Sequence, residues 1–74
     1  MSVVVRYPVT IRNEDRDAVD EILTQFYQRG ELDSVTVESI MIDCELKNKL
    51  WLECGMDDFI AIKNELNNRG VMFT

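Results

Sequence analysis

The chain has no histidine, only two cysteines, one proline and three glycines, and it contains no long apolar run. Without histidine, the commonest general base and the Ser-His and Cys-His nucleophile pairs are missing, so the sequence predicts a protein that is not an enzyme. The glycines stand singly at element boundaries and form no phosphate-binding loop. No apolar run approaches the roughly 20 residues of a membrane span, and the first residues lack the order of a signal peptide, so we expect a cytoplasmic protein.

The cysteines exclude further classes of site. Cys44 and Cys54 are too few and too far apart for a zinc ribbon, and no histidine is present to complete a mixed site. In the hairpin predicted below they lie at opposite ends of the strand pair, so we expect no disulfide. We interpret both as buried small hydrophobic residues, and we expect no metal and no other cofactor.

Charge and size limit the function further. The 74 residues include 14 acidic and 8 basic side chains, for a net charge of -6. Binding to a phosphate backbone depends on cations, so this balance argues against direct contact with nucleic acid. Hydrophobic residues make up 46% of the chain, which excludes a disordered tail and predicts one globular domain over residues 1–74.

The first half of the chain is typical of a strand followed by a helix. Apolar residues alternate along residues 2–11, which predicts a strand with one buried face. Pro8 falls on the other face, and we expect it at a bulge or where its nitrogen points away from a neighbouring strand. Asn13 is a good N-cap for a helix that ends at Arg29 and Gly30.

The middle of the chain predicts a hairpin of residues 34–44 and 48–54, joined near residues 45–47. Pairing residues whose numbers sum to 92 places Ile40 and Ile42 opposite leucines on the buried face. The same register turns Trp51 and Met41 to the other face.

A second helix is predicted from a cap at Asp57 to Arg69 and Gly70, and residues 71–74 are predicted to form a short last strand. The order strand, helix, strand, strand, helix, strand predicts an α+β fold. It is typical of the ferredoxin-like βαββαβ sandwich, a four-stranded antiparallel sheet with two helices on one face. A meander with packed helices is the alternative.

Two surfaces are candidates for binding a partner. The sheet face away from the helices is predicted to carry an apolar centre with charged neighbours, which is typical of an interface. Its residues are Val37, Met41, Trp51, Arg6 and Lys49. The first helix is predicted to present regularly spaced carboxylates that could imitate phosphate and occupy a basic groove. These are Glu14, Asp17, Asp20 and Glu21.

The sequence therefore predicts a small acidic, non-enzymatic protein-interaction module. Its partner would be another protein, such as a basic nucleic-acid-binding protein, and a homodimer is also expected. In size and charge alone it is similar to phage-encoded inhibitors of host nucleic-acid machinery, including anti-defence proteins, which would make it a viral inhibitor. The alternative is a regulatory domain that binds a small ligand as a homodimer.

Overall fold

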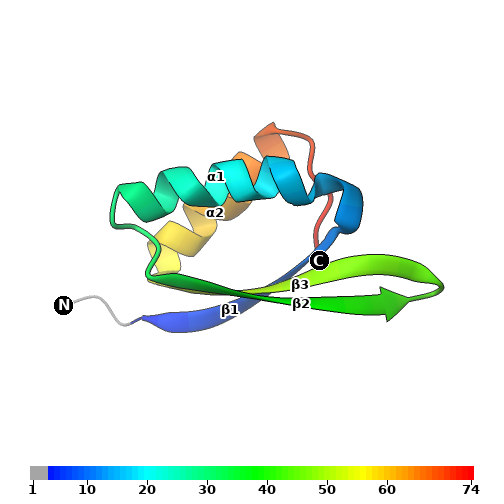
Figure 1. The fold of residues 1–74 in the computed structure, drawn as a ribbon. Helices are drawn as coiled ribbons and strands as arrows, with labels where there is room; N and C mark the ends of the chain where they lie inside the picture. The colour runs from blue at the N-terminus through cyan, green and yellow to red at the C-terminus, as the bar shows by residue number, and fades with distance from the viewer. Residues whose placement is uncertain (1–3) are drawn as a thin grey trace.

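The computed structural model describes residues 4–74, which form a three-stranded antiparallel sheet with two helices packed on one face (Figure 1). The elements, in chain order, are strand β1 (Val5–Arg12), a 3-10 turn η1 (Asn13–Asp15), helix α1 (Arg16–Gln28), strands β2 (Ser34–Ile42) and β3 (Glu45–Cys54), and helix α2 (Met56–Asn68). The α+β class is as predicted. The strand order is β1-β3-β2, so β3 is the central strand and β1 and β2 form the two edges.

The period-two pattern of β1 has the predicted effect. Val9 and Ile11 are buried against the helices, and Tyr7 is half-buried on the same face. Pro8 lies on the opposite face. Thr10 exchanges both of its backbone hydrogen bonds with Thr74, so its N–H points away from β3, and the Pro8 nitrogen points the same way because it lies two residues earlier. Proline therefore removes no hydrogen bond from the β1–β3 ladder.

Both helices end where the Arg-Gly pairs predict. Gly30 has a φ of 76°, a left-handed conformation that glycine adopts without a Cβ penalty. Its N–H donates to the carbonyl of Tyr27 at 3.1 Å, and the N–H of Glu31 donates to that of Phe26 at 2.9 Å. This pair of bonds is a Schellman motif, which satisfies the last carbonyls of α1 and turns the chain toward β2.

The predicted helix starts are wrong. Asn13 does not cap α1 but opens the 3-10 turn, and α1 begins only at Arg16. The Asn13 side chain instead accepts a hydrogen bond from the buried amide of Asn48 on β3. Helix α2 begins at Met56, after Gly55, so Asp57 lies in its first turn and does not act as the cap.

The predicted fourth strand is also wrong, and with it the four-stranded ferredoxin-like sheet. Residues 71–74 contribute only a single bridge, Phe73 to Ile11, beside the backbone bonds that join Thr10 and Thr74. The physical reason is that Val71 has another role. Its N–H closes α2 by donating to a carbonyl of the last helical turn, and its side chain is buried in the core.

The hairpin register differs from the prediction as well. Paired residues sum to 87, so Val37 lies opposite Leu50 and Val35 opposite Leu52. The turn consists of the two residues Asp43 and Cys44, both with positive φ, which matches the twist that a two-residue hairpin needs. Because 87 is odd and 92 is even, every side chain of β2 lies on the opposite face from the one predicted.

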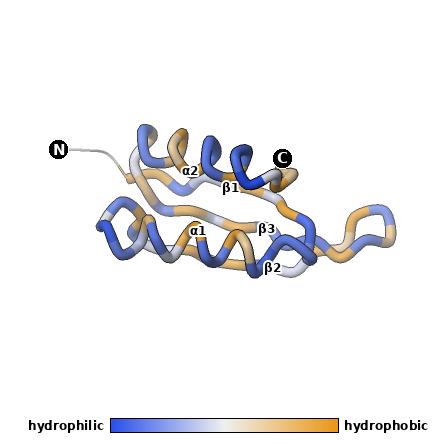
Figure 2. Tube along the Cα trace, turned by 90° about the horizontal axis from the view of Figure 1, so that it is seen from above, coloured by the Kyte–Doolittle hydropathy of each residue, from blue (hydrophilic) through white to orange (hydrophobic). Residues whose placement is uncertain are grey.

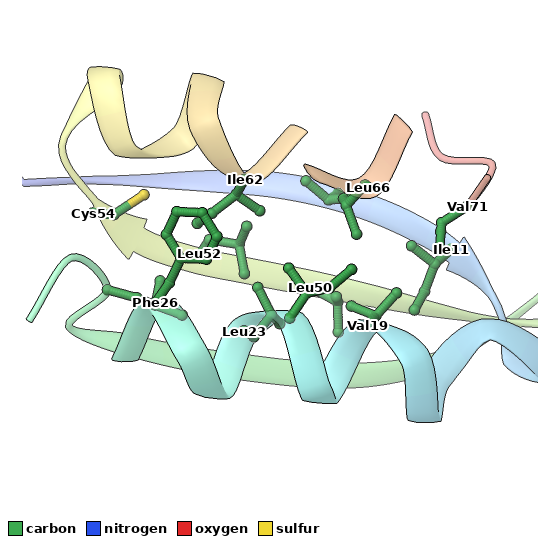
Figure 3. Close-up of a cluster of buried hydrophobic side chains, with 13 residues drawn as sticks. Ile11, Val19, Leu23, Phe26, Leu50, Leu52, Cys54, Ile62, Leu66 and Val71 are labelled. Carbon is green, nitrogen blue, oxygen red and sulfur yellow. The ribbon is translucent and has the colours of Figure 1, made fainter. Parts of the chain in front are cut away.

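The core lies between the sheet and the two helices (Figure 3). Leu50 and Leu52 of β3 are 1% exposed and contact the helix layer, where Ile22 and Ile62 are fully buried. Cys54 lies in the same cluster, and burial raises the pKa of its thiol above the ordinary value. Viewed from above, α2 lies over β1 and α1 lies over β2, so each helix flanks one edge of the sheet (Figure 2).

Candidate functional site

Both helices lie on one face of the sheet and leave the other face open (Figure 1). Trp51 lies at the centre of this open face. Trp51 lies in the central strand, with Pro8 of β1 on one side and Thr36 of β2 on the other. It is half-buried although no layer covers this face in the part of the chain described. Three strands hold the indole in place, so it is presented on a rigid platform.

Two cations flank the indole of Trp51. The guanidinium carbon of Arg6 lies 5.2 Å from the ring centroid, and the Lys49 ammonium nitrogen lies 4.6 Å from it. Both distances permit cation–π attraction, which is modest at exposed sites. Glu53 and Glu38 lie on the same face, and Arg6 forms an ion pair with Glu53 at 3.7 Å. The surroundings of Trp51 are therefore close to neutral in an otherwise acidic molecule.

Trp51, Arg6 and Lys49 thus lie together on the open face, as predicted, but Val37 and Met41 do not. The observed register places these two on the helix side of β2. Val37 packs against the core, whereas Met41 lies next to the end of β2 and is exposed. The tip of this hairpin extends past the helices (Figure 1). The predicted apolar centre is therefore reduced to the tryptophan and its immediate neighbours.

The acidic surface of the first helix is less uniform than predicted. All four carboxylate residues, Glu14, Asp17, Asp20 and Glu21, are exposed. Arg12 forms an ion pair with Glu14 at 3.1 Å, and Arg16 forms one with Asp20 at 3.0 Å. Within residues 4–74, no ion pair involves Asp17 or Glu21, so only these two carboxylates lack a nearby cation from the chain itself.

Arg12 is the last residue of β1, but its side chain is held by a residue of η1. Its Nε donates to the Asp15 carboxylate at 2.9 Å, and this hydrogen bond, together with the attraction of the same carboxylate, raises the pKa of the arginine. Arg12 therefore neutralises the acidic turn before α1 and does not contribute to the Trp51 platform.

A groove between α1 and the outer edge of β2 was not predicted from the sequence. Its volume is about 610 Å³, and its lining combines apolar side chains from both elements with an equal number of polar ones. The apolar side chains are Leu23 and Tyr27 from α1, Leu32 from the connection, and Val35 and Val37 from β2. Tyr27 is 62% exposed although it follows the apolar spacing of α1. The groove was missed because the predicted register turned the valines of β2 to the wrong face.

One end of the groove is fixed by a small polar network. Arg16 lines the groove, and its Nη1 donates to the side-chain oxygen of Asn48 at 3.2 Å. Asn48 is 2% exposed and its amide nitrogen donates to the Asn13 side chain at 3.1 Å. The buried amide therefore has its partners and holds η1 and α1 against β3.

The tip of the β2–β3 hairpin is unusually apolar for an exposed turn. Met41 is 65% exposed, Leu46 is 46% exposed and Ile42 is 42% exposed. Cys44 is exposed in the turn itself, so the prediction that both cysteines are buried is wrong for Cys44 and confirmed for Cys54. Both cysteines are free, as expected.

Other classes of site receive no support from the described residues. Among residues 4–74 no group of three or more His, Cys, Asp or Glu side chains is arranged to hold a metal ion. No helix in this range is long and apolar enough to cross a membrane. Comparison of the chain with protein-family models, with curated proteins and with solved structures gave no match.

Proposed function

We propose that this chain is a non-enzymatic protein-interaction module whose binding surface is the open sheet face around Trp51. The observation that carries the proposal is the tryptophan itself, held in the central strand between Pro8 and Thr36 with Arg6 and Lys49 beside the ring. Tryptophan and arginine are the residue types most often found as energetic anchors of interfaces. A rigid side chain also loses little conformational freedom on binding.

The charges around Trp51 indicate the chemistry of the partner. Arg6 and Lys49 lie within reach of anything seated on the indole. A matching partner would place an apolar side chain on the ring and a carboxylate near Lys49, because Arg6 already has Glu53 as its ion-pair partner. A strongly basic partner, such as a nucleic-acid-binding protein, fits this face less well than it fits the acidic side of α1.

The acidic side of α1 is the weaker of the two surfaces. Arg12 and Arg16 already neutralise Glu14 and Asp20, so the regular spacing of charge that would imitate a phosphate backbone is interrupted. Asp17 and Glu21 remain available to steer a basic protein toward the helix. An inhibitor of a nucleic-acid-handling protein would have to act through these two carboxylates.

The experiment uses the only tryptophan of the chain as its own probe. Partners captured from cells that express the tagged chain are purified and titrated against it while Trp51 fluorescence is recorded. Burial of the indole shifts the emission to shorter wavelength. The affinity of Trp51→Ala, which lacks the fluorescent probe, is measured by titration calorimetry. We expect this variant to bind about 30-fold or more weakly, as for the loss of an interface anchor. The matched surface variant Asp17→Asn should leave the affinity within a factor of about two.

A partner that binds Trp51→Ala as tightly as wild type, with no change in Trp51 emission, contradicts the proposal. If Asp17→Lys and Glu21→Lys abolish that binding instead, the acidic side of α1 is the binding surface and the partner is a basic protein.

A further inference from the structure

The outer edge of β2 is a strand edge with unused backbone hydrogen-bonding groups. The backbone N–H and C=O of Thr10 point away from β3. Because these directions alternate along each antiparallel ladder, the backbone groups of the odd-numbered residues of β2 also point away from β3. These residues are Val35, Val37, Ser39 and Met41. Within residues 4–74 no backbone hydrogen bond from outside the ladder reaches any of them.

Nothing on β2 protects this edge from pairing. Natural sheets protect their edges with lysine, proline, bulges or very short strands. Strand β2 is nine residues long and contains no lysine, arginine or proline. Its one charged side chain, Glu38, lies opposite Lys49 of β3 on the open face, a favourable cross-strand pairing of opposite charges. A single irregularity lies at the start of the strand, where Asp33 N–H donates to the Glu53 carbonyl.

We propose that β2 pairs antiparallel with β2 of a second copy of this chain, and that the two copies form a continuous six-stranded sheet. A two-fold axis at Val37 places this residue opposite its own equivalent, with the outward N–H and C=O of both in reach of each other. Thr36 then faces the Glu38 of the other copy. An axis at Glu38 would instead oppose two carboxylates, which is unfavourable.

In the same register, side chains of the second copy enter the groove between α1 and β2. This register brings Met41 of the second copy opposite Asp33, on the helix side of the sheet, next to the exposed Tyr27. Val37 of the second copy lies beside the apolar wall of the groove. The two most exposed large apolar side chains of α1 and β2, Tyr27 and Met41, would thus cover each other across the interface, once on each side of the axis.

The area available at this edge is at the lower limit for a specific dimer. A nine-residue strand is about 30 Å long, and the two shorter dimensions of the molecule are 21 and 17 Å. The edge with its helix therefore offers on the order of 500–600 Å² per copy, close to the lower limit for a specific interface. A second copy suits this edge better than a basic peptide does, because apolar side chains supply much of the lining and Arg16 offsets one of the two aspartates there.

The test is the mass in solution, measured by sedimentation equilibrium over a wide range of concentration. Wild type is expected to change from 8.6 kDa to twice that mass as its concentration rises. Ser39→Pro removes an N–H that points away from β3, so it keeps the hairpin but blocks the new ladder. The matched variant Ser39→Thr keeps that N–H. We expect Ser39→Pro to weaken the dimer about 30-fold or more, because symmetry removes two hydrogen bonds, and Ser39→Thr to leave it unchanged.

Two further measurements keep the proposal falsifiable if Ser39→Pro folds poorly. Met41→Lys acts at the far end of the same contact and should also dissociate the dimer. Hydrogen exchange of the Val35, Val37 and Ser39 amides of wild type should slow as the concentration rises. Each copy carries a charge of -6, so added salt should strengthen the dimer by screening the repulsion between the copies. Added salt would instead weaken the binding of a basic peptide to the same edge.

A chain that stays at 8.6 kDa at every concentration overturns the proposal. So does a dimer that Ser39→Pro and Met41→Lys leave intact, or one that only Trp51→Ala dissociates, since that would place self-association on the open face. A metabolite that stabilises the monomer and protects Tyr27 would assign the groove to a small ligand instead. Loss of the dimer leaves the proposed Trp51 surface unaffected, because that surface faces away from the groove.

Discussion

The two edges of the sheet differ in how they are closed. At the β1 edge, Tyr7 stacks on Phe59 of α2 with ring centroids 4.2 Å apart, and the Lys63 ammonium lies 4.7 Å from the Phe59 ring. Pro8 blocks pairing farther along, and Thr10 is bonded to Thr74. At the β2 edge, the corresponding space between strand and helix is a groove of about 610 Å³.

The β1 edge buries its own apolar side chains, whereas the β2 edge leaves some of them exposed. The helices are of equal length and end in the same glycine motif, so the asymmetry does not come from helix geometry. It comes from the side chains that face each edge. Tyr7 and Phe59 bury each other, whereas Tyr27 has no aromatic side chain to stack on among the described residues. An edge that cannot bury its own apolar residues is suited to a partner.

The largest expected effect on stability comes from replacing one tyrosine at each edge. Tyr7→Ala should lower the free energy of unfolding by about 2–3 kcal/mol, because it removes both apolar burial and the stacked pair. Tyr27→Ala should cost the monomer no more than about 0.5 kcal/mol, since that side chain is already largely exposed. Urea unfolding at low protein concentration measures both. Equal costs at the two edges would contradict the distinction between them.

A smaller effect is expected from the two glycines that end the helices. An L-residue with a φ near 75° is strained by roughly 1–2 kcal/mol, and nothing lies within 4 Å of a Cβ added at either glycine, so strain alone decides the cost. Gly70→Ala should cost at least as much as Gly30→Ala, because the bridge that closes the β1 edge is formed by Phe73, three residues after Gly70. Thermal unfolding of the two variants makes the comparison, and a more costly Gly30→Ala would show that the bridge adds no stability.

The smallest effect depends on pH and comes from Cys54, at the buried end of the hairpin. Burial raises the pKa of Cys54 in the folded state, so the unfolded chain loses this proton first as pH rises above the ordinary value of 9.0. Stability from Cys54 is therefore complete below pH 9.0 and is lost as pH rises through the folded pKa. Cys54→Ala should flatten the decline of unfolding free energy above that pH. Identical pH profiles for wild type and Cys54→Ala would contradict this assignment.

Local patterns in the sequence predicted the elements but not all of their pairings. The alternation in β1, the apolar spacing of α1 and the Arg-Gly ends were read correctly because each depends on residues within a few positions of one another. The hairpin register failed because Asp43 and Cys44 are not a common pair for a two-residue turn, and matching large apolar residues favoured another pairing. Three of the five residues predicted for the open sheet face lie there, and two were misplaced by that register.

The sequence by itself determined a small acidic α+β domain without histidine, with two amphipathic helices that each end at a glycine. These features follow from composition and from short-range periodicity. Only the tertiary structure decided that the last residues form a bridge instead of a strand, that Val37 faces the helices, and that one edge stays open. Those outcomes depend on which distant side chains meet, since a shift of one residue in register reverses a whole strand.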